Sequence, residues 1–182
     1  MLLAVITCGC DGPSSVRHPG DENDCDPAFT TCNWSDTSRI GLSTDTLFNY
    51  YSGTSVDTVV RYHYNLTGGD KLVFEYCYTS EDCKNILDEN WSEKLVFELD
   101  KSLSEFECSD SALADLQCVY QQYGFLFPRG ADRVLKGTIS GNKTSPKVWK
   151  ITAAVEIIYP NWPSIPEFTP KTIRFTEDFS KK

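Results

Sequence analysis

The chain has 182 residues, the length of one domain or of one domain with a tail. With 40% hydrophobic, 13% aromatic and 24% charged residues, it is too apolar to be fully disordered. Its 17 Lys and Arg against 26 Asp and Glu give a net charge of −9. This balance is unfavourable for binding phosphates, so we expect no nucleic-acid partner.

The amino terminus carries a short apolar run, residues 2–6, which ends at Cys8, Gly9 and Cys10 and is followed at once by polar residues. This run is far shorter than a transmembrane helix, and no other stretch is long and apolar enough, so we expect no integral membrane segment. A short apolar run followed by small residues is typical of a secretory signal.

The apolar run with Gly9 and Cys10 resembles the start of a bacterial lipoprotein, although a positive segment is missing and Thr7 stands where Leu is usual. The resemblance covers residues 1–10 only. It implies that residues 1–9 are removed and that Cys10 receives a lipid, which makes a membrane the first partner. Cys8 is a competing lipid site, and an ordinary cleaved signal is the alternative.

Residues 10–36 are rich in Gly, Pro, Ser and acidic residues and show no hydrophobic period, which predicts a tether leading to a domain over 37–182. The acidic residues at 21–26 lack the glycine and glutamate that a calcium-binding EF-hand loop needs at its sixth and twelfth positions. We therefore expect no metal in the tether.

Eight cysteines are many for a reducing compartment and indicate export from the cytosol. Without Cys8 and Cys10 an even number remains, which is consistent with disulfide bonds. Sequence alone cannot choose among the 15 connectivities of six cysteines, and pairing of close neighbours is the simplest hypothesis. No C-x-x-C spacing is present, so we expect neither zinc nor another cofactor. The predicted disulfide cysteines are Cys25, Cys32, Cys77, Cys83, Cys108 and Cys118.

Two stretches with alternating apolar residues, 55–66 and 71–79, flank Gly68 and Gly69. Because glycine suits tight turns, this pattern predicts a hairpin. Residues 93–99 alternate in the same way. Residues 133–140 and 147–158 predict a second hairpin, with its turn through Gly141, Asn142 and Pro146. Its return strand places Trp149 on a long apolar face, and a short last strand is predicted at 172–175.

The segment 110–122 has Leu113, Leu116 and Tyr120 at helical spacing, with Ser109 or Asp110 as a possible N-cap, which predicts a short helix. The alternative is a strand over 116–127. Many short strands, one helix and Gly- or Pro-containing turns predict an all-β antiparallel β-sandwich. A closed β-barrel is the alternative architecture.

Catalytic motifs are missing, and the two histidines, His18 in the tether and His63 on a predicted strand, do not favour an enzyme. A hydrolase would need His63 to meet a serine or a carboxylate pair. The aromatic residues in predicted loops or edges suit stacking on sugars or anchoring a protein interface, or they cap the ends of the fold. These are Trp34, Trp91, Trp162, Tyr50 and Tyr51.

The sequence therefore favours a lipid-anchored, extracytoplasmic, non-enzymatic module that binds a protein or carbohydrate partner at a cell surface. One alternative is a secreted eukaryotic or viral glycoprotein, and another is a barrel that carries a small ligand. In the glycoprotein case the four N-x-S/T sites would carry glycans. They are Asn33, Asn65, Asn90 and Asn142.

Overall fold

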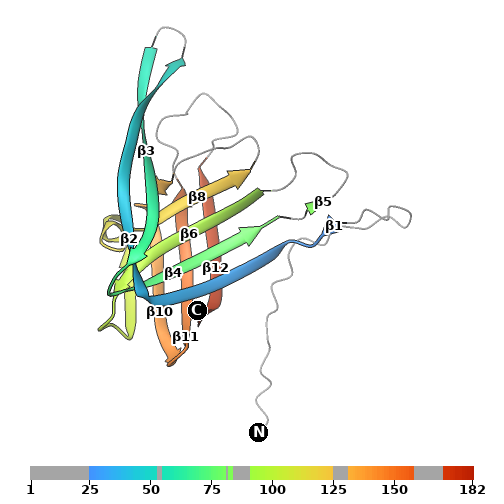
Figure 1. The fold of residues 1–182 in the computed structure, drawn as a ribbon, viewed down its shortest axis with the longest axis vertical. Helices are drawn as coiled ribbons and strands as arrows, with labels where there is room; N and C mark the ends of the chain where they lie inside the picture. Colours follow the sequence, from blue (N-terminus) through green and yellow to red (C-terminus); the bar gives the residue numbers. More distant parts are fainter. Residues whose placement is uncertain (1–24, 53–54, 81, 84–90, 125–130, 158–169) are drawn as a thin grey trace, which may run out of the picture.

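The structure, a computed structural model, describes residues 25–52, 55–80, 82–83, 91–124, 131–157 and 170–182. In these ranges the chain forms twelve strands and one 3-10 turn (Figure 1). The strands are β1 (Cys25–Asp26), β2 (Phe29–Ser52), β3 (Ser55–Gly68), β4 (Lys71–Thr79), β5 (Asp82–Cys83), β6 (Trp91–Asp100), β7 (Glu105–Ser109), β8 (Val119–Gly124), β9 (Asp132–Arg133), β10 (Gly137–Ser145), β11 (Val148–Ile157) and β12 (Lys171–Lys181).

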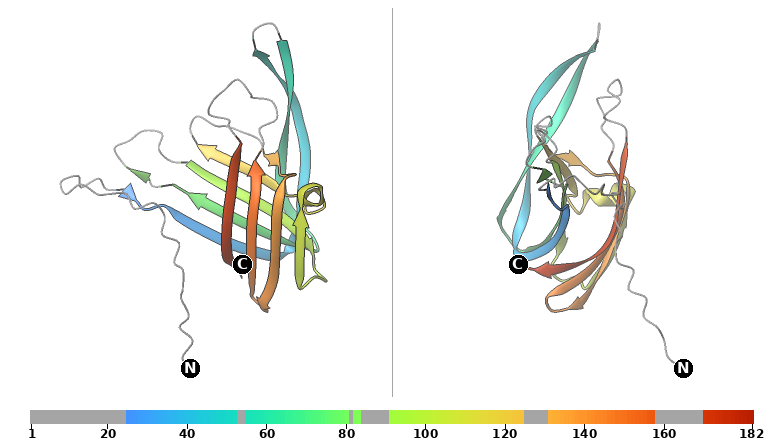
Figure 2. Two further views of the ribbon diagram at one scale, coloured as in Figure 1. Left: turned by 180° about the vertical axis from the view of Figure 1, so that it is seen from behind. Right: turned by 90° about the vertical axis from the view of Figure 1, so that its right-hand side faces the viewer.

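One large sheet with the order β7-β10-β11-β12-β2-β4-β6-β8-β9 curls into a half-barrel, as the two views in Figure 2 show. Its only parallel pairing among the described strands joins β12 to β2, at Ser180↔Asn33 and Lys181↔Trp34. The all-β prediction is confirmed, but the sandwich is wrong because one curved sheet, rather than a second sheet, covers the apolar face. The sheet is not a closed barrel either.

Strands β1 to β5 form one long antiparallel hairpin, which we call the long hairpin. β3 pairs with the second half of β2, from Ser38↔Gly68 to Ser52↔Ser55. β4 pairs with the first half of β2, from Phe29↔Thr79 onward. The predicted hairpin between β3 and β4 is therefore wrong, although both strands exist. Gly68 and the glycine after it mark a bend within one long strand, and neither has a positive φ.

The concave face of the sheet holds the inner core. Alternate residues of β4, β6 and β11 point into it, as the sequence predicts. Phe74 lies at its centre, with ring centroids 5.0 Å from Phe97, 5.4 Å from Trp149 and 5.9 Å from Phe179. The predicted apolar face of β11 is completely buried. Aromatic side chains thus form the centre of the inner core, and aliphatic side chains surround them.

A second apolar cluster lies on the outer face of the same sheet, under the second half of the long hairpin. Ile40, Val73, Val96, Val119 and Ala131 form this outer cluster. Backbone hydrogen bonds in both directions between residues 62 and 131 hold the long hairpin against the sheet. Because the hairpin folds back over them, β4 and β6 are buried on both faces at these positions, which simple alternation did not predict.

The second predicted hairpin is confirmed as β10 and β11, but Gly141 and Asn142 lie within β10 and the reversal is at 146–147. The predicted strand at 172–175 lies inside the longer β12. No described helix is long and apolar enough to cross a membrane.

The predicted helix at 110–122 is wrong. Only a 3-10 turn forms, Asp110–Ala114. Of the alternative strand at 116–127, the part over 119–124 is confirmed as β8, and 125–127 lie outside the described residues. Leu113, Leu116 and Tyr120 are buried, but they reach the core from the 3-10 turn, the hydrogen-bonded turn that follows it and a strand in succession. Positive φ values at Asp110 (49°) and Gln117 (47°) break any helical continuity. The helical spacing of the apolar residues was therefore coincidental.

The ordered fold also begins earlier than the sequence indicates. Strand β1 starts at Cys25 and β2 at Phe29, so the predicted boundary between tether and domain at 36/37 falls inside β2. The signal segment and the first part of the tether lie outside the described residues.

Candidate functional site

The most unusual side chains on the concave face lie at one rim of the half-barrel. Odd-numbered residues of β6 point inward: Leu95, Phe97 and Leu99 belong to the inner core, and Trp91 and Glu93 continue the same face toward the start of the strand. Tyr78 of β4, Tyr120 of β8 and Lys171 of β12 join them. We call Tyr78, Trp91, Glu93, Tyr120 and Lys171 the rim cluster.

Glu93 is the buried charge of this cluster, with 7% of its surface exposed. Tyr120 Oη donates a hydrogen bond of 2.9 Å to Glu93 Oε2, and Lys171 Nζ forms an ion pair with the same oxygen. A carboxylate in an otherwise apolar interior requires such partners, because an unpaired buried charge is strongly unfavourable. Three strands thus converge on one carboxylate.

Lys171 also contacts an aromatic ring. Its ammonium lies 4.8 Å from the centroid of the Trp91 ring, and the Tyr78 ring is 5.3 Å from the same indole. The backbone of Trp91 is fixed by Ser80, whose side-chain oxygen accepts from the Trp91 N–H at 3.0 Å. Trp91 is half-buried, so at the rim its indole ring, with the backbone fixed by Ser80, lies beside the half-exposed ammonium of Lys171.

The charge on Glu93 affects the pKa of Tyr76, which lies deeper in the inner core. Burial first and the nearby Glu93 carboxylate second raise the pKa of Tyr76 to about 12. The Tyr76 ring stacks on Phe175 with centroids 4.2 Å apart, which closes the interior between β4 and β12. Burial likewise raises the pKa of the Cys32 thiol to about 12, so Cys32 is a thiol at neutral pH.

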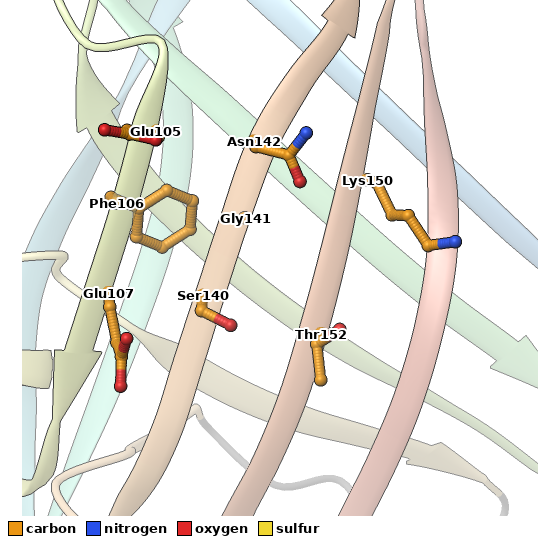
Figure 3. A pocket seen from close by; sticks show the side chains of 8 residues that line it. All are labelled: Glu105, Phe106, Glu107, Ser140, Gly141, Asn142, Lys150 and Thr152. Carbon is orange, nitrogen blue, oxygen red and sulfur yellow. The ribbon is translucent and has the colours of Figure 1, made fainter.

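A second candidate is a shallow depression of about 520 Å³ on β7, β10 and β11 (Figure 3). Cross-strand partners build it in two rows: Glu107, Ser140 and Thr152 form one row, and Glu105, Asn142 and Lys150 form the other. These side chains are polar and largely exposed. The arrangement is typical of the solvated outer face of an antiparallel sheet.

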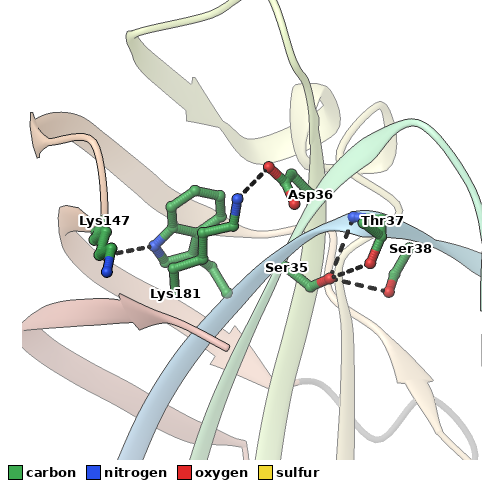
Figure 4. Close-up of polar contacts among 7 residues, drawn as sticks. Ser35, Asp36, Thr37, Ser38, Lys147 and Lys181 are labelled. Atoms are coloured by element: carbon green, nitrogen blue, oxygen red, sulfur yellow. Dashed lines mark hydrogen bonds and ion pairs between the residues drawn. The ribbon is translucent and has the colours of Figure 1, made fainter.

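Trp34 is one of the aromatic residues for which the sequence leaves open either partner binding or a structural role at the end of the fold. It is 2% exposed, and its indole nitrogen donates to the Lys147 carbonyl at 3.1 Å. Lys143 and Lys181 lie 5.8 Å and 5.3 Å from its ring centroid. Figure 4 shows this end of the sheet, where Lys181 pairs with Asp36 at 2.5 Å. That lysine lowers the pKa of the Asp36 carboxyl. Trp34 therefore has a structural role.

The other candidate aromatics differ in what the structure describes. Trp91 belongs to the rim cluster, and Trp162 lies outside the described residues. The backbones of Tyr50 and Tyr51 belong to β2, and their side chains are outside the description.

Three of the four N-x-S/T sites lie in strands rather than turns. Asn65 in β3 and Asn142 in β10 are exposed, and Asn33 in β2 is half-buried. Asn90 lies outside the described residues. The predicted turn position of Asn142 is thus wrong, although Asn65 and Asn142 are both exposed.

The strands also decide between disulfide pairings. Residues 25 and 32 are separated along an extended chain by about 23 Å at 3.3 Å per residue, far beyond the Cα separation of a disulfide. Cys77 pairs with Thr31 and Cys83 with Cys25 along the same ladder, six positions or about 20 Å apart, so the register is incompatible with these two local pairs. Cys32, Cys77, Cys108 and Cys118 are thiols in the structure. Complete burial raises the pKa of the Cys118 thiol.

His63 is exposed on β3, with Ser43 as its cross-strand partner. Across the part of the chain that the structure describes, no three His, Cys, Asp or Glu side chains gather closely enough to hold a metal ion. His18 lies outside the described residues.

Comparison of this chain with protein families, with curated proteins and with solved structures finds no match. The rim cluster must therefore be judged on its own geometry. Sequence reasoning singled out Trp91 but missed Glu93, Tyr120 and Lys171. One feature of the sequence could have identified Glu93: it alternates in step with Leu95 and Phe97, so the alternation places it on the same inward face.

Proposed function

We propose that the protein is an extracytoplasmic, non-enzymatic binding module, held at a membrane by a lipid on Cys10, that recognises a protein or carbohydrate partner through the rim cluster. The sequence of the first ten residues supports the anchor. The number of cysteines supports the compartment. The rim cluster supports the binding role.

One observation carries the choice of surface: the contact of Lys171 with both Glu93 and the Trp91 ring. An ion pair in a largely buried position adds little stability, because desolvation of the two charges offsets their attraction. Its presence at the end of an apolar face therefore needs another reason. A tryptophan such as Trp91 beside a charged pair such as Glu93 and Lys171 has the composition of an interface hot spot. The flat indole ring can also stack on a sugar ring.

Replacement of Cys10 by Ser tests the anchor. The variant is expected to move from the membrane fraction to the soluble fraction, whereas the control Cys8→Ser is expected to stay with the membrane. Intact-mass measurement of the native protein should show acyl chains on an amino terminus at Cys10. Unchanged fractionation of Cys10→Ser, or hexose-rich heterogeneity in place of acyl chains, contradicts the lipid anchor and favours the secreted glycoprotein.

Replacement of Trp91 by Ala tests the rim. Tyr123→Ala is the matched control, because Tyr123 is an exposed aromatic of β8 that also lies near a lysine, at 5.5 Å from Lys94. On a glycan array and an immobilised panel of surface proteins, Trp91→Ala should weaken binding roughly tenfold or more, the size of a hot-spot loss. The control should bind like the wild type. Equal binding of all three proteins excludes the rim as the recognition surface.

A further inference from the structure

The two short strands β1 and β5 continue the ladder of β2 and β4 without a shift. Cys25 pairs with Cys83, Phe29 with Thr79, and Ser35 with Val73. The two residue numbers of each pair have the same sum from Cys25↔Cys83 to Ser35↔Val73, before the irregularity between Ser35 and Ser38, so each step along one strand is matched by one step along the other. Cys25 and Cys83 are therefore register partners at the open end of the long hairpin, where Figure 1 shows the short strands β1 and β5 side by side.

This register suits a disulfide bond. Partners in an antiparallel ladder have Cα atoms about 4.5 or 5.5 Å apart, according to the type of pair. Both values lie within the range of about 4.4–6.8 Å that a disulfide accepts. Only backbone placement enters this argument.

The same register excludes the neighbouring pair of cysteines. Cys32 lies opposite Tyr76, and Cys77 lies opposite Thr31, so the two cysteines are offset by one residue. Because successive side chains of a strand point to opposite faces, Cys32 faces the inner core while Cys77 faces outward. An offset of one residue thus leaves Cys25 and Cys83 as the only in-register cysteine pair between the strands of the long hairpin.

We propose that Cys25 and Cys83 form a disulfide bond that closes the base of the long hairpin. The two thiols lose two protons and two electrons, and the electrons reduce the disulfide of an oxidant to two thiols. In an extracytoplasmic compartment that oxidant is the disulfide of a thiol oxidoreductase. In vitro, oxidised glutathione serves and is reduced to two molecules of glutathione. The occurrence of the bond in the cell rests on the proposed extracytoplasmic location.

The position of the bond gives it a mechanical role. The N-terminal segment that would carry the anchor joins the domain at Cys25, so any pull from a membrane acts on the first pair of the ladder. Without a crosslink, that pull separates the pairs of β1–β5 and then β2–β4 one after another from the open end. β1 and β5 pair over two residues each, which is too short a ladder to resist alone. A covalent bond at the first pair prevents this separation.

The test maps the bond directly. The purified folded chain is oxidised with oxidised glutathione, and its free thiols are blocked with iodoacetamide in denaturant. The chain is then reduced, labelled with N-ethylmaleimide, and digested with trypsin and a protease that cleaves at acidic residues. N-ethylmaleimide is expected on Cys25 and Cys83, and iodoacetamide on Cys32 and Cys77. In Cys83→Ser, Cys25 should carry iodoacetamide or, in the intact mass before reduction, a single glutathione in mixed disulfide, because no partner thiol is present to displace it. The control Cys77→Ser should keep the N-ethylmaleimide label at Cys25 with no glutathione attached.

Two results overturn the proposal. One is N-ethylmaleimide on Cys25 together with Cys32 or Cys77 while Cys83 carries iodoacetamide, and the other is an iodoacetamide label on Cys25 after oxidation. The same mapping on protein isolated directly from cells tests the compartment separately. A bond that forms in vitro while cellular protein is fully reduced supports the pairing and contradicts the extracytoplasmic location. The bond in both samples supports both proposals.

Discussion

The long hairpin and the C-terminal strands β10 to β12 are built from the same alternation of apolar and polar residues, but they use it differently. In β10 to β12 each strand pairs with the next along the chain, and one face is buried. In the long hairpin, β3 and β4 follow one another on the same partner, and the ribbon then folds over its own sheet. Alternation therefore specifies a strand but not its neighbour, which depends on where the chain reverses.

The largest effect is expected where the two regions share a core. Phe74 of the long hairpin is fully buried and contacts Trp149 and Phe179 of the C-terminal strands. Phe74→Ala should lower the free energy of unfolding by about 3–5 kcal/mol, the usual cost of deleting a buried phenyl ring. Urea denaturation followed by both fluorescence and circular dichroism measures it. Phe29→Ala, at a position 55% exposed in the same hairpin, is the control and should change little.

If the two regions unfold independently, the two probes will give separate transitions in the Phe74→Ala variant. A single transition shows that the shared core makes the fold cooperative.

The next largest effect is expected at Gly137 of β10, in contrast to Gly68 of the long hairpin. Gly137, at the start of β10, has φ +110°, and a Cβ there would lie 2.3 Å from the Ala154 carbonyl oxygen. Gly68 at the bend of the long hairpin has an ordinary φ and nothing within 4 Å of such a Cβ. Gly137→Ala is therefore expected to cost about 2–4 kcal/mol, from strain and a backbone clash. Gly68→Ala should change the free energy of unfolding by less than about 0.5 kcal/mol.

Thermal or urea unfolding of both glycine variants measures this difference. A large loss for Gly68→Ala would mean that the bend needs a conformation that only glycine adopts, as the predicted turn required.

These glycines also show what the sequence was able to predict. Gly68 and Gly69 look like a turn because glycine is common in turns, but the chain does not reverse there. The Gly69 N–H donates to the Thr37 carbonyl at 3.1 Å, and a Cβ on Gly69 would lie 2.7 Å from the Arg39 side chain. Close approach at a bend, rather than positive φ, explains at least Gly69, and sequence alone does not distinguish the two uses.

The inner faces of β6 and β11 were predictable, because a strand that is buried on one side has apolar residues at every second position of its sequence. Val96 and Glu98 were not, because their burial depends on the long hairpin crossing the outer face. Glu98 accepts from the Ile40 N–H at 2.6 Å and from Gln117 at 3.1 Å, contacts between residues far apart in the chain. The rim cluster escaped prediction for a similar reason: Glu93 and Tyr120 lie on the paired strands β6 and β8, but Lys171 comes from β12 and reaches Glu93 only because the sheet is curved.

The two buried tryptophans allow a finer comparison. Trp34 in the long hairpin donates its indole N–H to the Lys147 carbonyl, whereas Trp149 Nε1 is buried without a hydrogen-bond partner. Replacement by Phe removes similar volume from both sites but breaks a hydrogen bond only at Trp34. Trp34→Phe should therefore destabilise the fold by about 1 kcal/mol more than Trp149→Phe. Equal losses by urea denaturation would show that the Trp34 hydrogen bond adds no net stability.

The smallest effect at neutral pH is expected for Cys32, and it grows with pH. The folded thiol has a pKa of about 12 because of burial first and the Glu177 charge second, against 9.0 for an ordinary thiol. Between these values only the unfolded chain ionises at Cys32, so stability present below about pH 9 is lost as the pH rises toward 12.

Cys32→Ala removes the loss of stability that the ionisation of Cys32 causes at alkaline pH. Its urea midpoint should therefore fall less steeply than that of the wild type between about pH 8 and pH 10.5. Tyr76 contributes a similar loss of stability at alkaline pH in both proteins, because burial also raises its pKa to about 12. Parallel pH profiles of the two proteins would mean that the Cys32 thiol ionises as easily in the folded chain as in the unfolded one. That result would place Cys32 in water rather than against the inner core.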